Sequence, residues 1–286
     1  MSSATDWALL VLPGLIWGAS FLFIAEGLEA LAPDGVTFVR IAIGFLTLSL
    51  IPAARRPIAR ADWKGTAWLG VLWMAFPLSM FPHAEQHVSS AMTGMLNGAT
   101  PLFATAVAAL LAHRLPSRAV VVGLAVGLLG ALLVAAPTLG EGQSSTISVL
   151  LIVAALVSYG VAINLARPLQ QRNGALPVIW RALAVSLVLT APLGLPALLH
   201  AQWTLRAALC MLALGALGTG IANVLVAVAA GRIGATRASA STFLMPAVAL
   251  VLGLAVRGER VAAIAMVGGA VCLVGAWLVR RASLRG

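Results

Sequence analysis

Charged residues are scarce in this chain. Aspartate, glutamate, lysine and arginine make up 9% of its 286 residues, whereas hydrophobic residues make up 61%. A soluble domain carries about 25% charged residues. So few charges cannot cover a surface that faces water, and lipid must therefore be the main solvent of the chain. The composition argues against a soluble enzyme.

Cysteines and catalytic signatures are scarce too. The two cysteines, Cys210 and Cys272, lie in apolar segments. They predict no disulfide framework and no metal site, and we interpret them as small packing residues. The sequence has no phosphate-binding P-loop and no HExxH motif, and its four histidines are scattered. We therefore expect no enzymatic activity, no metal and no cofactor.

The apolar runs that dominate the sequence predict ten membrane-spanning helices. Their limits are 7–28, 34–52, 65–82, 91–112, 118–136, 147–166, 175–198, 206–229, 235–256 and 261–279. The connections are short, which leaves no room for a soluble domain. The first run is long enough to span a bilayer and has no basic segment before it, so we do not expect a cleavable signal peptide.

The basic residues predict the orientation of these spans. Most lie on one side, at Arg55, Arg56, Arg60, Lys64, Arg114, Arg118, Arg167, Arg172, Arg232, Arg237, Arg280, Arg281 and Arg285. The other side holds Arg206, Arg257 and Arg260. Positive loops face the cytoplasm, so both termini are expected there. Because the charges lie between apolar segments and not along one face, the net charge of +10 does not predict a nucleic-acid partner.

The two halves of the chain repeat one another. Gly70, Pro101, Gly123 and Gly130 recur 145 residues later as Gly215, Pro246, Gly268 and Gly275, and residues 120–134 resemble residues 265–279. Each half, 1–140 and 141–286, holds five predicted spans. Because five is odd, the second half must be inverted, and Arg40 and its mate Arg181 lie near opposite faces. Inverted repeats are typical of secondary transporters that bind substrate between the halves.

Matching prolines indicate where such a site would lie. Pro101 falls inside the fourth span and Pro246 inside the ninth, and a proline within a helix frees a carbonyl and bends the helix. Interrupted helices at corresponding places in two halves point to a transporter site. A kink that touches no ligand is the alternative. Asn97 lies one turn before Pro101, and the repeat mates Trp17 and Tyr159 could stack on a ligand ring.

Coupling to an ion gradient is weakly indicated. Glu26 is the acid placed clearly inside a span, and it could titrate during transport or be a satisfied interface residue paired with Arg40. With Arg40 and Arg181 it forms the set of candidate gating or coupling residues. The sequence shows no chain of acids at midplane depth, so facilitated transport or exchange is favoured over proton antiport.

The order of these features resembles the EamA family of the drug/metabolite transporter superfamily. The resemblance depends on Trp17-Gly18, Arg40, Arg181, Ser89-Ser90-Ala91, Ser239-Ala240-Ser241 and Gly258-Glu259. It covers nearly the whole chain. One departure is His113-Arg114, where the first half would be expected to show Gly-Glu.

The resemblance implies an all-α membrane protein with ten helices in two inverted five-helix repeats around a central cavity. The fifth and tenth spans would lie outside the cavity. Family members move small metabolites, often outward across the bacterial inner membrane, and within the family the chain is similar to the YddG-type exporters of aromatic and other neutral amino acids. The implied substrate cavity comprises Trp17, Met80, His83, Asn97, Pro101, Tyr159, Asn164, Trp180, Met245 and Pro246. Asn164 could equally serve as a hydrogen-bonding residue between helices.

Two other functions are alternatives to amino-acid export. An exporter of lipophilic drugs or cations would need an acid at the midplane, and Glu26 is the only candidate. A scaffold or a lipid-modifying enzyme is disfavoured because no acids or histidines cluster at one depth.

Overall fold

The computed structural model describes residues 4–113, 115–139 and 142–283, and within these ranges it contains helices and no strands. In the first half the elements are α1 (Ala4–Leu28), α2 (Pro33–Ser49), η1 (Pro52–Arg55), η2 (Arg60–Asp62), α3 (Trp63–Leu69), η3 (Gly70–Ala75), α4 (Phe76–Ala84), α5 (Ser90–Asn97), α6 (Thr100–Leu111) and α7 (Arg118–Leu139). In the second half they are α8 (Gln143–Asn173), α9 (Ala175–Leu198), α10 (Leu205–Ala213), η4 (Leu214–Ile221), α11 (Ala222–Ile233), α12 (Ala235–Ala238), η5 (Ser239–Leu244), α13 (Met245–Arg257) and α14 (Ala263–Ser283).

The prediction of an all-helical membrane protein is confirmed. Within the described ranges, 8 helices are long and apolar enough to cross a membrane. Helix α2, with 17 residues, is not among them, and neither is the run α3–η3–α4. The count of ten spans therefore stays a prediction.

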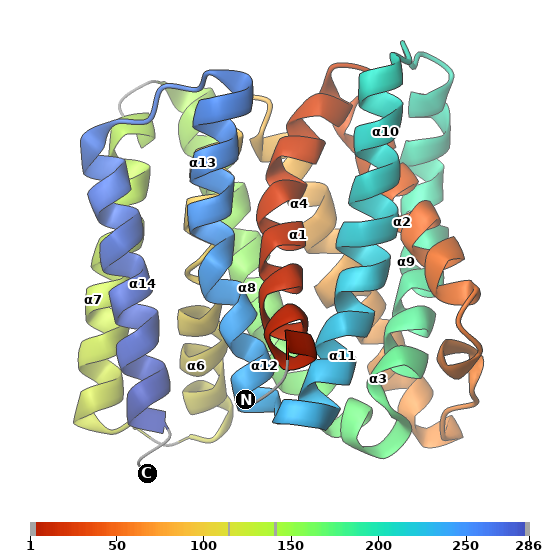
Figure 1. The fold of residues 1–286 in the computed structure, drawn as a ribbon, viewed down its shortest axis with the longest axis horizontal. Helices are drawn as coiled ribbons and strands as arrows, with labels where there is room; N and C mark the ends of the chain where they lie inside the picture. The colour runs from red at the N-terminus through yellow and green to blue at the C-terminus, as the bar shows by residue number, and fades with distance from the viewer. Residues whose placement is uncertain (1–3, 114, 140–141, 284–286) are drawn as a thin grey trace.

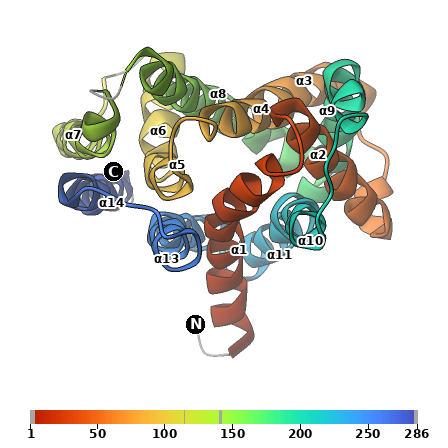
Figure 2. The same ribbon diagram turned by 90° about the horizontal axis from the view of Figure 1, so that it is seen from above.

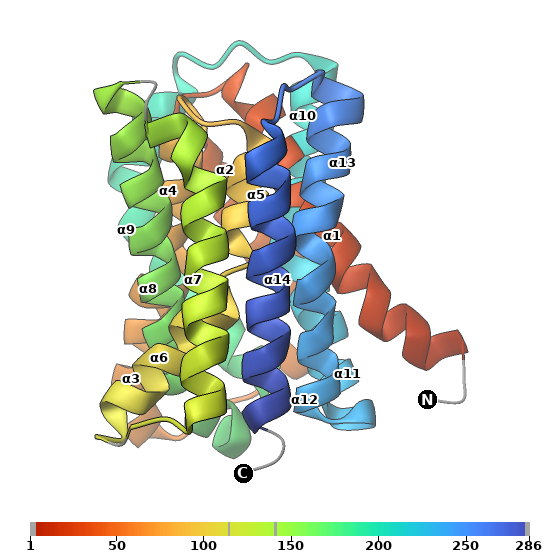
Figure 3. The same cartoon turned by 90° about the vertical axis from the view of Figure 1, so that its left-hand side faces the viewer.

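The helices stand side by side, and the two halves of the chain start at opposite ends of the bundle. Figure 1 shows the start of α1 and the end of α14 at the lower end, which we call the termini end. Helix α8 starts at the upper end, which we call the far end, and runs in the direction opposite to α1 (Figures 1 and 3). This is the arrangement that an inverted second half requires.

Helices α7 and α14 pack against each other at one edge of the bundle (Figure 2). A Cβ atom added to Gly130 would lie 2.2 Å from the backbone nitrogen of Cys272, and one added to Gly275 would lie 2.2 Å from that of Gly127. The helix backbones approach this closely because small residues leave space for them. The strongest sequence repeat is thus a packing interface between its own two copies.

Helices α4 and α11 each follow a segment with π-helical winding, η3 and η4. The mates Gly70 and Gly215 lie at these segments. A Cβ on Gly70 would come within 2.8 Å of the Ala182 carbonyl oxygen, and one on Gly215 within 3.0 Å of the Arg40 carbonyl oxygen. Each wide turn therefore packs against the helix that carries the arginine of the other half. Such turns are frequent at functional sites.

The two matched prolines lie at helix starts and not inside continuous helices. Helix α5 ends at Asn97, and Pro101 lies in the first turn of α6. Pro246 lies in the first turn of α13, after the 3-10 segment η5. The hydroxyl of Thr100 donates to the Asn97 carbonyl oxygen at 2.7 Å, next to the break. The expected kinks are therefore a break between α5 and α6 and a change from 3-10 to α winding between η5 and α13.

Candidate functional site

A cavity of about 190 Å³ lies between the two halves. Its walls come from α1, α2, η3, α4, the α5–α6 break, α8, η4, α11, η5 and α13. Helices α7 and α14 contribute none of its lining residues. We call it the central cavity.

Part of the predicted site lines this cavity. Trp17, Arg40, Asn97, Tyr159 and Met245 do so. The residues predicted for the cavity or for coupling that do not line it are Glu26, Met80, His83, Pro101, Asn164, Trp180, Arg181 and Pro246. Other residues line the cavity that were not predicted from the sequence, among them Ser20, Trp73, Phe81 and Thr219.

Arg40 is the charged residue of the central cavity. It is 5% exposed, and its Nε donates to Thr219 Oγ1 at 3.3 Å. Within the described ranges Arg40 forms no ion pair. Thr219 in turn donates to the Leu214 carbonyl oxygen at 3.3 Å, across the wide turn of η4. The π-helical segment thus holds the hydroxyl that orients the Arg40 guanidinium.

Aromatic rings form part of the wall of this cavity. Phe21 and Phe81 meet edge to face with centroids 5.8 Å apart, and Phe81 lies 6.0 Å from Tyr159. The indole nitrogen of Trp17 donates to the Gly218 carbonyl oxygen at 3.0 Å, which joins α1 to η4. These rings give the cavity a largely apolar wall with fixed geometry.

The other predicted residues form contacts outside the central cavity. His83 Nε2 lies 3.7 Å from Asp34 Oδ1. Trp180 donates from its indole nitrogen to Ser49 Oγ at 2.8 Å, and the Arg181 guanidinium lies 5.3 Å from the centre of the Trp180 ring. The Asn164 amide donates to the Ala104 carbonyl oxygen at 2.9 Å, between α8 and α6. Met80 packs against the hydrophobic core.

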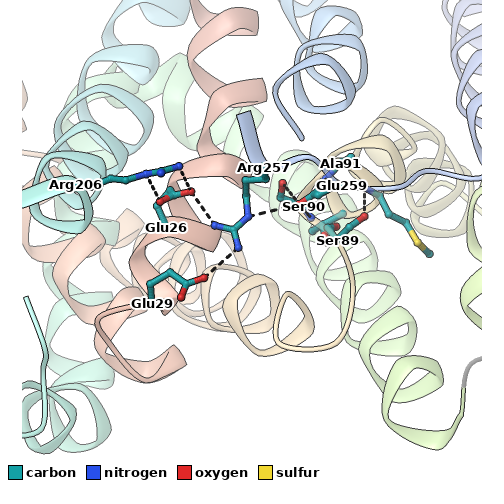
Figure 4. A network of polar contacts seen from close by, with 10 residues as sticks. Glu26, Glu29, Ser89, Ser90, Ala91, Arg206, Arg257 and Glu259 are labelled. Atoms are coloured by element: carbon teal, nitrogen blue, oxygen red, sulfur yellow. Dashed lines mark hydrogen bonds and ion pairs between the residues drawn. The ribbon is translucent and has the colours of Figure 1, made fainter. Parts of the chain in front are cut away.

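Glu26 does not pair with Arg40. Its carboxylate accepts from Arg206 Nη2 at 2.7 Å and from Arg257 Nη1 at 2.8 Å (Figure 4). Arg257 also donates to Glu29 at 3.1 Å. Two of the three arginines expected on the outer side, Arg206 and Arg257, are thus bound to acids, and Glu26 is one member of an ion network.

Glu259 connects this network to the start of α5. It accepts from the backbone nitrogens of Ser90 at 3.0 Å and Ala91 at 2.9 Å, and from the Ser90 hydroxyl at 2.8 Å (Figure 4). A carboxylate placed at a helix N-terminus satisfies free N–H groups and the helix dipole. We call Glu26, Glu29, Ser90, Ala91, Arg206, Arg257 and Glu259 the far-end network. It joins residues of both halves.

The first half lacks this cap. His113 has φ 49°, close to the φ 63° of its mate Gly258, so the left-handed turn recurs. The residue after Gly258 is the capping Glu259, whereas His113 is followed by Arg114, which lies outside the described residues. The sequence therefore offers no carboxylate at the matching position.

A second, larger cavity opens at the far end. It measures about 660 Å³ and is lined in part by Glu29, Glu85, His200, Gln202 and Arg257. We call it the far-end vestibule. It is more polar than the central cavity, and the aromatic layer of Phe21 and Phe81 belongs to the central cavity alone.

Comparisons with known proteins agree with this architecture. The model of the EamA-like transporter family matches residues 7–136 and again residues 146–281. A protein of Streptantibioticus cattleyicolor, named as a probable terminal-alkyne amino-acid exporter, is 30% identical over 287 residues, which cover 99% of this chain and 95% of that protein. The uncharacterized transporter YdfC of Bacillus subtilis is 27% identical over 267 residues, covering 91% and 86%. A solved crystal structure with 19% identity covers 99% of both chains with a TM-score of 0.66, which shows the shared fold.

Proposed function

Because this chain belongs to the EamA-like transporter family, we propose that it exports amino acids with apolar or aromatic side chains through the central cavity. The observation that carries the proposal is the isolated Arg40 guanidinium in an otherwise apolar and aromatic cavity. A carboxylate is the group that such a guanidinium binds best, since it accepts charge-assisted hydrogen bonds. Trp17, Tyr159 and Met245 would then surround the substrate side chain.

The α-ammonium group of the substrate needs acceptors, and the α5–α6 break offers them. Asn97 and Thr100 both line the cavity, and the Asn97 side-chain oxygen accepts from the Thr100 hydroxyl at 3.2 Å. An amide oxygen keeps a second lone pair for a ligand. Arg40 and Asn97 would therefore fix the two ends of a zwitterion.

The cavity size favours a small metabolite. Sites for drug-sized ligands measure roughly 300–1,000 Å³, and the central cavity measures about 190 Å³. The named function of the Streptantibioticus relative, export of an amino acid, supports the same substrate class. Export of lipophilic cations, the second candidate, finds less support because the cavity lining contains an arginine and no carboxylate.

We further propose that the far end faces the outside of the bacterial inner membrane and that both termini are cytoplasmic. The proposal is supported by the far-end arginines Arg206 and Arg257, which are paired with acids, while the majority of the basic residues is expected at the termini end. The two halves, 1–140 and 141–286, would rock against each other to expose the central cavity alternately.

Flux measurements test this function. The purified protein in liposomes loaded with labelled phenylalanine, leucine or propargylglycine should exchange label with external unlabelled amino acid. Liposomes without protein and liposomes loaded with a labelled lipophilic cation are the controls. If no neutral or aromatic amino acid shows protein-dependent exchange, the substrate proposal is wrong.

A further inference from the structure

Glu85 is a half-buried acid that the proposed transport path does not use. It lies directly after α4, in the loop that leads to α5, and its backbone nitrogen donates to the Phe81 carbonyl oxygen at 2.9 Å. Both of its carboxylate oxygens are buried, and neither has a hydrogen-bond partner within the described ranges. Glu26 and Glu259, by contrast, are saturated by the far-end network.

An ionised carboxylate in this position would be costly, because an unpaired buried charge loses its hydration and gains nothing in return. The nearby cations do not pair with it. Arg257 donates to Glu26 and Glu29, and Arg40 donates to Thr219. Burial raises the pKa of the Glu85 carboxyl well above its ordinary value, and Glu259 adds to the rise, while Arg40 and Arg257 oppose it. Burial therefore disfavours the ionised form of this carboxyl in the present conformation.

The position of Glu85 connects the two cavities. Glu85 lines the far-end vestibule, and Phe81, one helical turn earlier, lines the central cavity. The two residues therefore connect the walls of the two cavities, and both carboxylate oxygens of Glu85 are buried there.

We propose that Glu85 is a proton-binding site whose occupancy is required for closure of the far end. When the far end opens, water enters and the carboxyl releases its proton to the vestibule. When the far end closes, one proton is taken up from the vestibule and the neutral carboxyl is buried again. The inference depends on the proposed function only in treating the far end as the exit.

The sign of the pH effect follows from linkage. The open form exposes Glu85 to water, where the pKa of a glutamate is about 4.3, and the closed form holds it higher. Closure is therefore fully favoured below about pH 4.3, and it is lost progressively as pH rises through the closed-state pKa. With one proton bound per closure, the ratio of closed to open molecules changes by about tenfold per pH unit between the two values.

Other titratable groups could contribute, so the test must isolate Glu85. Those that line the vestibule or act on Glu85 are Glu29 directly after α1, Arg40 of α2, His200 after α9, Arg257 of α13 and Glu259 before α14. Glu26 of α1 accepts from Arg257, and His83 and His87 lie close to Glu85 in the sequence.

Spin-label distances across the vestibule measure far-end closure without any substrate. Labels on Gln86→Cys and Gln202→Cys, both exposed positions, report the separation of the halves in a variant without native cysteines.

The open fraction of the protein with native Glu85 should grow with pH. Glu85→Gln, which cannot ionise, should stay closed at every pH, and Glu85→Ala should be equally insensitive. Glu29→Gln removes an exposed vestibule acid and should keep the pH response.

The same labels give the outcome that would overturn the inference. A pH response of Glu85→Gln or Glu85→Ala equal to that of native Glu85, or no response with native Glu85, would show that this carboxyl does not control closure. The distance measurement needs no substrate. A failure of amino-acid exchange would therefore contradict the proposed function, but the distances would still test the role of Glu85 in closure.

Discussion

At the scale of single residues, environment separates three acids that the sequence cannot distinguish. Glu26 is bound by two arginines, Glu259 caps a helix, and Glu85 has no partner within the described ranges. The sequence favoured Glu26 for coupling because it lies inside a predicted span. The contacts that decide the role of each acid come from the other half of the chain, and pairing over such separations leaves no local signal.

Arg40 gives the first prediction at this scale. Arg40→Gln removes the charge while leaving an amide in place, and charged hydrogen bonds contribute about 1.5–3 kcal/mol. We expect amino-acid affinity to fall by roughly 10- to 150-fold, since each 1.4 kcal/mol is tenfold. Competition of labelled substrate in liposomes measures this. Its repeat mate supplies the control, since Arg181→Gln lies outside the cavity and should leave affinity unchanged. Equal losses in both variants would contradict a carboxylate-binding role.

Asp62 gives a prediction about acid stability. Arg172 donates to both of its oxygens, at 3.2 and 2.6 Å, and Asn173 donates at 2.7 Å, which holds the pKa of the Asp62 carboxyl below its usual value. Its contribution to stability is present above about pH 3.9, the unfolded value, and is lost as pH falls through the lower folded value. Thermal unfolding in detergent should show Asp62→Asn less stable at neutral pH, with the difference shrinking in acid. A constant difference across this range would refute the ion-pair explanation.

At the scale of elements, the repeat is visible in the sequence, but the helices that its glycines contact became visible only in three dimensions. Residues 120–134 and 265–279 are the clearest repeat in the sequence, and they form the α7–α14 contact away from both cavities. The helix starts at Pro101 and Pro246 were expected as kinks. The π-helical turns were not expected, because winding depends on packing against α2 and α9 and not on local composition.

The α7–α14 interface gives a prediction at this scale. An alanine at Gly130 would place its Cβ 2.2 Å from backbone, so the helices must separate. We expect Gly130→Ala to destabilise the protein by about 1–3 kcal/mol, as overpacking does. Gly231→Ala in α11 is the matched control, since no atom lies within 4 Å of its added Cβ. Steric trapping or thermal unfolding in detergent compares the two, and equal melting temperatures would mean that the contact is looser than the structure shows.

At the scale of the whole molecule, different contacts join the two inverted halves at the two ends of the bundle. The repeat, the charge bias and the order of the motifs predicted the family and the fold class from sequence alone. Of the residues named for the cavity, Trp17, Asn97, Tyr159 and Met245 line it, as does Arg40, which was named for gating or coupling. The departure at His113-Arg114 was visible in the sequence, but the sequence did not show which contact the Gly-Glu pair makes in the other half. In the structure, its counterpart Glu259 caps α5 across the two halves at the far end, whereas Asp62 joins the halves through Arg172 in the basic loop region.

The Glu259 cap gives the last prediction. Glu259→Gln keeps the shape of the side chain but removes the charge that faces the start of α5. Loss of a helix cap costs about 0.5–2 kcal/mol, and this cap exists only while the halves meet at the far end. The ratio of closed to open molecules should therefore fall by about 2- to 30-fold, which the Gln86–Gln202 label distances measure at fixed pH. Glu29→Gln, which removes an exposed acid of the same network, should shift the ratio less, because exposed ion pairs contribute about 0–1 kcal/mol. If Glu259→Gln stays as closed as the native protein, the Glu259 cap stabilises α5 alone and does not contribute to closure of the far end.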